Sequence, residues 1–203
     1  MKRTFIIFLF LITANIFVVA QTNVSVELDK NSTISIFGTT NLISFKLIQR
    51  GEKLTKKNFN ITATLNKNKI YLSQNTYSIL VTDFTSNNKM ALRDFLKLVK
   101  SNTYPSFQVQ LNYIDLILKT NKNDYLVGNV CVNITITGIT KQYIIPISTV
   151  KNEDLYTLKG LKKVNIHDFG LTPPIEMMGL IRVNEWIEID FNIICKITTN
   201  KST

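Results

Sequence analysis

The residues that could support catalysis are few and scattered along the chain. The sequence contains one histidine, His167, and two cysteines, Cys131 and Cys195. A serine nucleophile held on a sharp turn needs a G-x-S-x-G motif, which the sequence lacks. A Cys–His pair has no sequence feature that would bring its members together. We therefore expect His167 to be a hydrogen-bonded turn residue and the protein not to be an enzyme, with an unrecognised hydrolase built on His167 as an alternative.

Metal and phosphate chemistry have no better support. One histidine and two distant cysteines do not give the ligand spacing of a zinc site, and no glycine-rich phosphate-binding loop is present. Residues 168–170 read Asp-Phe-Gly, but the other loops of a protein kinase are missing. Glu188 and Asp190 alternate with apolar residues, so both should face solvent. We predict no cofactor and no metal.

Apolar and aromatic side chains are more abundant. Large aromatics and flexible methionines line apolar pockets well, although any one of them can be ordinary core. The candidates are Phe37, Phe45, Phe84, Met90, Phe95, Phe107, Phe169, Met177, Met178 and Trp186. Whether they surround a cavity depends on the elements that position them.

Most of the chain reads as half-buried β-strands. Strict alternation of apolar and polar residues, the period of such strands, runs through residues 59–65, 107–113, 130–137 and 187–193. In the second of these, Phe107, Val109, Leu111 and Tyr113 share the apolar face. Further strands are predicted at 24–28, 33–38, 43–49, 77–81, 143–148 and 155–164. Turn chemistry occurs at Gly51, at Thr137-Gly138 and at 121–123. One buried face and one wet face indicate antiparallel sheets.

One segment changes to helical spacing. Between residues 89 and 100 the apolar side chains fall on one face, and four basic residues lie three or four positions apart on the other. Asn87 or Asn88 can cap the start. This pattern predicts a short amphipathic helix that packs on the sheet or closes an open end of a barrel.

These elements predict an all-β fold, either a closed barrel or a sandwich. A barrel of about eight strands can be filled by its own side chains or can hold one small ligand. Alternation identifies the buried face, but it does not distinguish a filled interior from an open one.

The N-terminus has the layout of a secretory signal peptide. Lys2 and Arg3 precede an apolar run that ends at Val18-Val19-Ala20, a suitable cleavage site. A retained membrane anchor is the alternative, because the run approaches the length that spans a bilayer. We predict a signal peptide at 1–20, a single domain at 21–203, and export to a periplasm or secretion.

The net charge of +10 suggests a partner class. An exported protein is not expected to bind nucleic acid, whereas a basic surface can favour an anionic membrane. A solvated, lysine-rich surface with no such role is the alternative, since the lysines form no long run. The two cysteines permit a disulfide, but Cys131 falls on the polar side of its strand and Cys195 on the apolar side, unless a bulge near Ile193 shifts the phase.

Four segments together resemble a known family. They read DKNSTISIFGTTNLISFKL from residue 29, NNKMALRDFLKLVKSNTYPSFQVQL from 87, GNVCVNITITGITKQYIIPI from 128 and VNIHDFGLTPPIEMMGLIRVNEWIEIDFNI from 164. Their order and spacing resemble the YceI-like family of lipocalin-like, polyisoprenoid-binding proteins. A better-known branch of that family carries His-Ser near the first strand, where this chain has Gly38-Thr39-Thr40, so head-group contacts should differ.

The resemblance implies an extended, lipocalin-like antiparallel β-barrel of about eight strands with one short inserted helix. It also implies an exported protein that carries a long-chain apolar ligand, such as a polyisoprenoid or another lipid, in a tunnel. Arg93 or Lys97 could attract an anionic head group at the rim. The alternative is a structural or adhesion module with a filled core. The implied ligand-lining residues are Phe45, Phe84, Met90, Phe95, Phe107, Phe169 and Met178.

Overall fold

The computed structural model describes residues 21–54, 58–73, 75–117, 125–176 and 180–200. The strands are β1 (Gln21–Leu28), β2 (Thr33–Thr39), β3 (Ser44–Arg50), β4 (Asn58–Asn66), β5 (Lys69–Ser73), β6 (Thr76–Leu80), β7 (Ser106–Ile117), β8 (Tyr125–Ile136), β9 (Ile139–Asn152), β10 (Leu155–Asn165), β11 (Ile175–Glu176), β12 (Ile181–Arg182) and β13 (Trp186–Asn200). One α-helix, α2 (Lys89–Leu98), and three 3₁₀ turns, η1 (Gly51–Lys53), η2 (Val81–Asp83) and η3 (Ile166–Phe169), complete the described elements.

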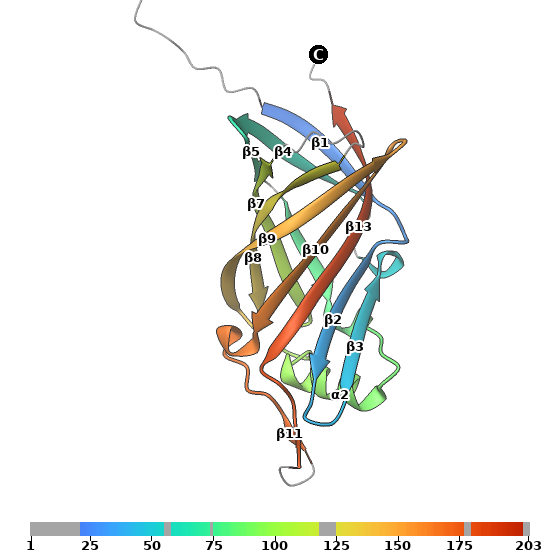
Figure 1. Ribbon diagram of the computed structural model, residues 1–203, viewed down its shortest axis with the longest axis vertical. Coiled ribbons are helices and arrows are strands. Elements are labelled where there is room, and N and C mark those ends of the chain that lie inside the picture. The colour runs from blue at the N-terminus through green and yellow to red at the C-terminus, as the bar shows by residue number, and fades with distance from the viewer. Residues whose placement is uncertain (1–20, 55–57, 74, 118–124, 177–179, 201–203) are drawn as a thin grey trace, which may run out of the picture.

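Eight of the strands close into a ring, so the fold is the barrel that the family resemblance implied and not the sandwich that alternation also allowed. Their order is β1-β4-β5-β7-β8-β9-β10-β13, and β13 pairs back onto β1. Neighbouring strands of the ring are antiparallel. Closure leaves no exposed sheet edge in this part of the molecule. Figure 1 shows an elongated barrel, with the β4–β5 turn at its upper end and α2 and β11 at its lower end.

The barrel extends downwards because two long strands, β13 and β7, each pair with two shorter strands on the same side, one above the other. β13 pairs with β1 through Cys195–Asn200 and with β2 through Glu188–Asn192. β7 likewise pairs with β6 through Ser106–Gln110 and with β5 through Tyr113–Asp115. The lower wall therefore ends in two edges, β3 and β6. The chain after β6 closes onto β3, where Ile48 and Thr85 exchange two backbone hydrogen bonds of 2.8 Å each.

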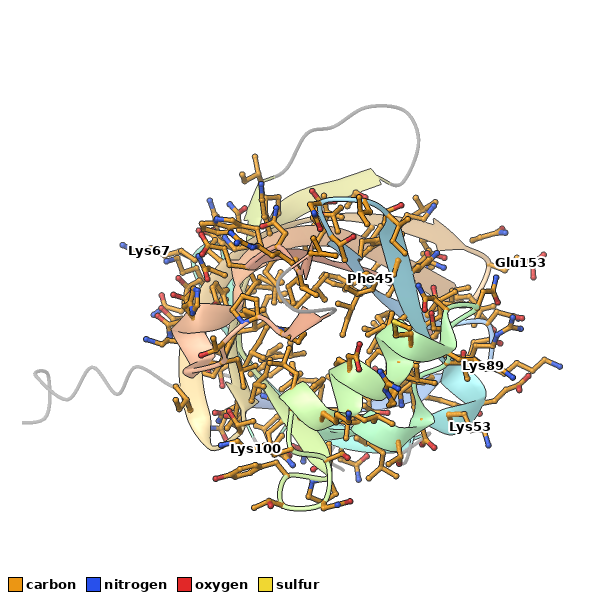
Figure 2. The ribbon with its side chains drawn as sticks, turned by 90° about the horizontal axis from the view of Figure 1, so that it is seen from below. Phe45, Lys53, Lys67, Lys89, Lys100 and Glu153 are labelled. Atoms are coloured by element: carbon orange, nitrogen blue, oxygen red, sulfur yellow. The ribbon has the colours of Figure 1, made fainter. Side chains whose placement is uncertain are left out.

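Helix α2 follows this closure and lies across the lower end of the barrel (Figures 1 and 2). Asn88 caps its start, and the Oδ1 atom accepts a 3.0 Å hydrogen bond from the Ala91 amide. The helix ends earlier than the predicted residue 100. Lys100 has a positive φ of 51°, and its amide and that of Ser101 bond back to Lys97 and Leu96.

The predicted turn at Thr137-Gly138 is confirmed. Both residues have positive φ, 50° and 82°, which is the requirement of a two-residue type I′ hairpin, here joining β8 to β9. Gly51 lies in η1, where a Cβ would meet the Asp29 carbonyl oxygen. The turn predicted at 121–123 lies outside the described residues.

The predicted face of Tyr113 was wrong. A β-bulge shifts the register between β7 and β8, so that Leu111 pairs with Val132 and Tyr113 with Cys131. Asn112 is the extra residue. Phe107, Val109 and Leu111 point into the barrel as predicted, but after the bulge Ile114 takes the inward position and Tyr113 points out. Strict alternation in a sequence cannot reveal such a phase change.

Candidate ligand cavity

A cavity of about 580 Å³ runs along the inside of the barrel. This volume lies within the range of small-molecule sites. Inward residues of opposite walls line it, and the alternation predicted for β8 and β13 is confirmed there. The lining residues of these two strands are Val130, Val132, Ile134 and Ile136 from β8, and Ile187, Ile189, Phe191 and Ile193 from β13.

Six of the seven predicted ligand-lining residues lie in the cavity wall. They are Phe45, Phe84, Met90, Phe95, Phe107 and Phe169. Figure 2, which looks along the barrel from below, shows Phe45 inside the ring of strands. The seventh, Met178, lies outside the described residues, as does Met177. The sequence therefore identified residues that β3, α2, β7 and η3 bring together from distant parts of the chain.

Two of the broader aromatic candidates do not reach the cavity. Phe37 points outward from β2, with the Lys46 ammonium 4.8 Å from its ring centre. Trp186 is also on the outside, 43% exposed, with Lys163 5.5 Å from its ring. Each is adjacent in its strand to a residue that points inward, and because successive side chains of a strand point to opposite faces, both lie on the outer face of the barrel.

Two glycines let aromatic rings lie flat against the wall. Gly38 pairs across the sheet with Phe45, and Gly160 pairs with Phe191. A Cβ at Gly38 would lie 2.3 Å from Phe45 Cζ, and one at Gly160 would lie 2.3 Å from Phe191 Cζ. Each ring therefore occupies the space of the missing side chain, a known stabilising pair in sheets. This arrangement keeps both rings out of the centre of the cavity.

The upper end of the barrel is closed by packed side chains. Val26, Ile61 and Cys195 form a small buried cluster there, and none of the three lines the cavity. Leu28 and Phe59, next to this cluster, are lining residues and mark where the cavity stops.

The lower end is open among the described residues. The lining residues Leu42, Ile43 and Met90 are 68%, 55% and 53% exposed, so the cavity wall continues onto the surface. Leu42 and Ile43 belong to the β2–β3 turn, and Met90 belongs to the first turn of α2. This rim is the mouth of the cavity.

The wall is almost entirely apolar. Among the described residues, no lysine, arginine or histidine lines it; the polar lining residues are Thr40, Asn75, Tyr77, Asn88, Asp94 and Asn184. Asn75 exchanges two hydrogen bonds with the Leu111 backbone, at 2.6 and 2.7 Å. Asp94 pairs with Arg93 at 3.1 Å. Burying a polar group without a partner is costly. Because Asn75 and Asp94 already have partners within the protein, an apolar ligand can cover them without leaving them unpaired.

The rim is held by residues 38–41, which begin with the Gly38-Thr39-Thr40 segment noted in the sequence. Thr40 Oγ1 accepts hydrogen bonds from the Leu42 and Ile43 amides, at 3.1 and 2.9 Å. The Asn41 side chain donates to the Leu180 carbonyl at 2.9 Å and accepts from the Arg182 amide at 3.0 Å. The segment thus joins the β2–β3 turn to the β11–β12 pair, which the sequence analysis did not predict.

Gln49 is an unusual feature of β3. It pairs with the inward-facing Ile34 and is buried, and neither its Oε1 nor its Nε2 has a hydrogen-bond partner among the described residues. Leaving such an amide unpaired costs about 1–3 kcal/mol. Neither charge nor periodicity marked this position in the sequence.

Among the described residues, Asp94 and Tyr77 are the titratable side chains that line the cavity, and the other titratable groups lie outside it. His167 is in η3, and its Nε2 is 3.2 Å from Glu185 Oε2 on the exposed surface. The Tyr143 hydroxyl donates to Asp168 at 3.0 Å, and partial burial together with that bond raises the pKa of Tyr143. The described residues contain no group of three or more His, Cys, Asp or Glu that could hold a metal.

The cysteines are unpaired and both buried. Cys195 faces inward and Cys131 outward, as their strand phases predicted, and β13 continues its register with β10 through Ile193 without a bulge. Burial raises the pKa of Cys195 to about 11. Cys131 is buried on the outer face beside Tyr113, and the pKa of Tyr113 is raised because the two groups would repel each other as anions and because they share a hydrogen bond.

Comparisons with known proteins add a fold-level likeness. No protein-family model and no curated protein matches the chain. Among solved structures, Burkholderia cenocepacia BcnA is similar at a TM-score of 0.56 with 16% identity, over 83% of this chain and 99% of that one. A polyisoprenoid-binding domain from Saccharophagus degradans, implicated in plant cell wall breakdown, gives 0.55 with 9% identity, over 89% and 99%. A mutant Campylobacter jejuni YCEI protein gives 0.46 with 13% identity, over 70% and 81%.

The chain shares its fold with a polyisoprenoid-binding domain. This agrees with the YceI-like resemblance of the sequence, and the extended, lipocalin-like barrel that the resemblance implied is present. The similar domain from Saccharophagus degradans is described as a binding domain. None of the described helices is long and apolar enough to cross a bilayer.

Proposed function

We propose that this protein is an exported binding protein that carries a long-chain apolar ligand, such as a polyisoprenoid or another lipid. The observation that carries the proposal is the apolar cavity, which is closed at the upper end and open at the mouth. The shared fold with a polyisoprenoid-binding domain supports the same ligand class.

The physical basis of binding is burial of apolar surface. At about 25 cal/mol per Å², a ligand that buries roughly 400 Å² gains on the order of 10 kcal/mol before the costs of association. No cationic side chain of the described part of the chain lines the wall, so a charged head group would be better placed at the mouth than inside. A long tail with its polar end at the mouth fits this division.

Export is proposed from the sequence of residues 1–20, which have the layout of a signal peptide. A periplasmic or secreted carrier would move lipid between sites that water separates. Carrying a lipid requires no covalent chemistry. The exposed position of His167 beside Glu185 supports a surface role for that residue.

Lipid extraction tests the proposal directly. The purified protein should release a long-chain lipid into organic solvent, identified by mass spectrometry, and the emptied protein should take up an added polyisoprenoid. Empty extracts with no uptake would favour the alternative, a structural or adhesion module.

A matched pair of variants ties uptake to the cavity. Ile134 lines the wall, whereas the next residue, Thr135, points outward from β8. Ile134→Trp should lower uptake of added polyisoprenoid at least tenfold, because the indole occupies ligand space. Thr135→Trp should leave uptake unchanged. Equal uptake by the two variants would place the ligand elsewhere.

A further inference from the structure

The mouth of the cavity combines an apolar tip with a basic flank. Leu42, Ile43 and Met90 at the rim are joined by Leu180, which is 69% exposed and whose carbonyl is held by Asn41. Four large apolar side chains from the β2–β3 turn, the start of α2 and the turn between β11 and β12 thus project at one end. Contiguous exposed apolar side chains of this kind mark interaction sites.

The basic flank is the outer face of α2. Lys89, Arg93, Lys97 and Lys100 line a shallow groove of about 600 Å³ along the helix. Asp94 is the acidic residue of α2, and it pairs with Arg93. No described carboxylate forms an ion pair with the three lysines. Figure 2 shows Lys89 and Lys100 at the two ends of the helix, projecting away from the barrel.

We propose that the mouth is a docking surface for an anionic lipid bilayer. The four apolar side chains enter the interfacial region, and the three lysines bind the anionic head groups around them. The hydrogen bonds of Thr40 and Asn41 hold two of the three rim elements in place, so little order has to be created on docking.

Continuity between the tip and the cavity decides in favour of a bilayer as the occupant. Three of the four tip residues are also cavity-lining residues. A bilayer that covers the mouth therefore touches the cavity wall directly, and a lipid can pass between them without exposing its tail to water. The transfer of lipid rests on the proposed carrier function. Binding to the bilayer can be measured separately from it.

The test measures co-sedimentation of the purified full chain with vesicles of phosphatidylcholine alone and with vesicles containing 30% phosphatidylglycerol, at about 0.1 M salt. Binding is expected only with the anionic vesicles. Lys89→Gln combined with Lys97→Gln and Lys100→Gln should weaken it roughly a hundredfold. Leu42→Ser combined with Leu180→Ser should weaken it at least tenfold.

Matched controls come from the upper end. Leu65, 63% exposed, lies near the β4–β5 turn at the end opposite to the mouth (Figure 1). Leu65→Ser, and Lys67→Gln combined with Lys151→Gln and Lys196→Gln, should leave vesicle binding unchanged. All variants carry the same N-terminus, so any contribution of residues 1–20 is constant.

Three outcomes would overturn the proposal. They are no binding to anionic vesicles, equal losses from the mouth and control variants, and a dimer in sedimentation analysis that the Leu42 and Leu180 changes dissociate. Uptake of a polyisoprenoid from detergent micelles is measured on the same variants. If uptake is normal but vesicle binding is absent, docking fails alone; if uptake is also absent from the unaltered protein, the proposed function fails.

Discussion

The upper and lower parts of the barrel are built from the same strand pattern but have opposite interiors. In the upper part, Val26, Ile61 and Cys195 meet and fill the space. In the lower part, inward side chains just as apolar, such as Val132 and Ile145, surround a cavity. The difference shows that alternation determines which side of a strand is buried, while the geometry of the wall decides whether opposite side chains touch.

The wall of the lower part is made of different strands. In the lower part, β2 takes the place of β1 beside β13, and β6 takes the place of β5 beside β7. The wall there also includes β3, the segment around Thr85 and α2. Glycines at 38 and 160 then let two phenylalanine rings lie against the wall. The upper ring has no such insertion, and its side chains meet.

The largest expected difference between the two regions is in the stability lost when a buried isoleucine of each is shortened to alanine. Ile61 and Ile145 are 6% and 5% exposed, but only Ile145 lines the cavity. Ile61→Ala should lower the free energy of unfolding by about 3–4 kcal/mol, because it opens a void in packed surroundings. Ile145→Ala should cost about 1–2 kcal/mol, since its side chain already has a gap on one side. Urea unfolding of the ligand-free protein measures both, and equal costs would show that the lower interior is packed as well.

Adding a methyl group to the wall tests how the cavity is kept open. Gly38→Ala places a Cβ where the Phe45 ring lies, so the ring must move into the cavity. We expect a loss of about 1–3 kcal/mol in stability, as in other overpacked sites, and a several-fold drop in polyisoprenoid uptake.

The double variant Gly38→Ala with Phe45→Ala provides the control for that experiment. It removes the displaced ring, and uptake should return. Continued loss of uptake in the double variant would contradict the assigned role of the glycine.

The smallest effect concerns the thiol in the filled end. Burial raises the pKa of Cys195 from 9.0 to about 11, because the apolar surroundings disfavour the thiolate. The unfolded chain ionises first as pH rises, so this group leaves stability unchanged below pH 9 and lowers it between pH 9 and 11. In a Cys131→Ser background, Cys195 should react with a thiol reagent at pH 8 only after unfolding in urea. Fast reaction of the folded protein would show that water enters the upper end.

The sequence alone determined the strand faces, the helix and the candidate lining residues. Alternation follows from local backbone geometry, in which successive side chains point to opposite faces, so the inward residues of β8 and β13 could be read directly. The helical period of α2 is equally local. Seven aromatic and methionine residues were assigned to the wall because the family resemblance implied that role, and the six that lie among the described residues do line the cavity.

Only the tertiary structure decided the bulge at Asn112, the unpartnered amide of Gln49 and the pairing of Gly38 with Phe45. Each depends on which residue lies opposite in a neighbouring strand, and that register is set by contacts between distant segments. The open interior has the same origin. Whether facing side chains meet depends on the width of the barrel, which arises from closure of the whole sheet and is not encoded in any one strand.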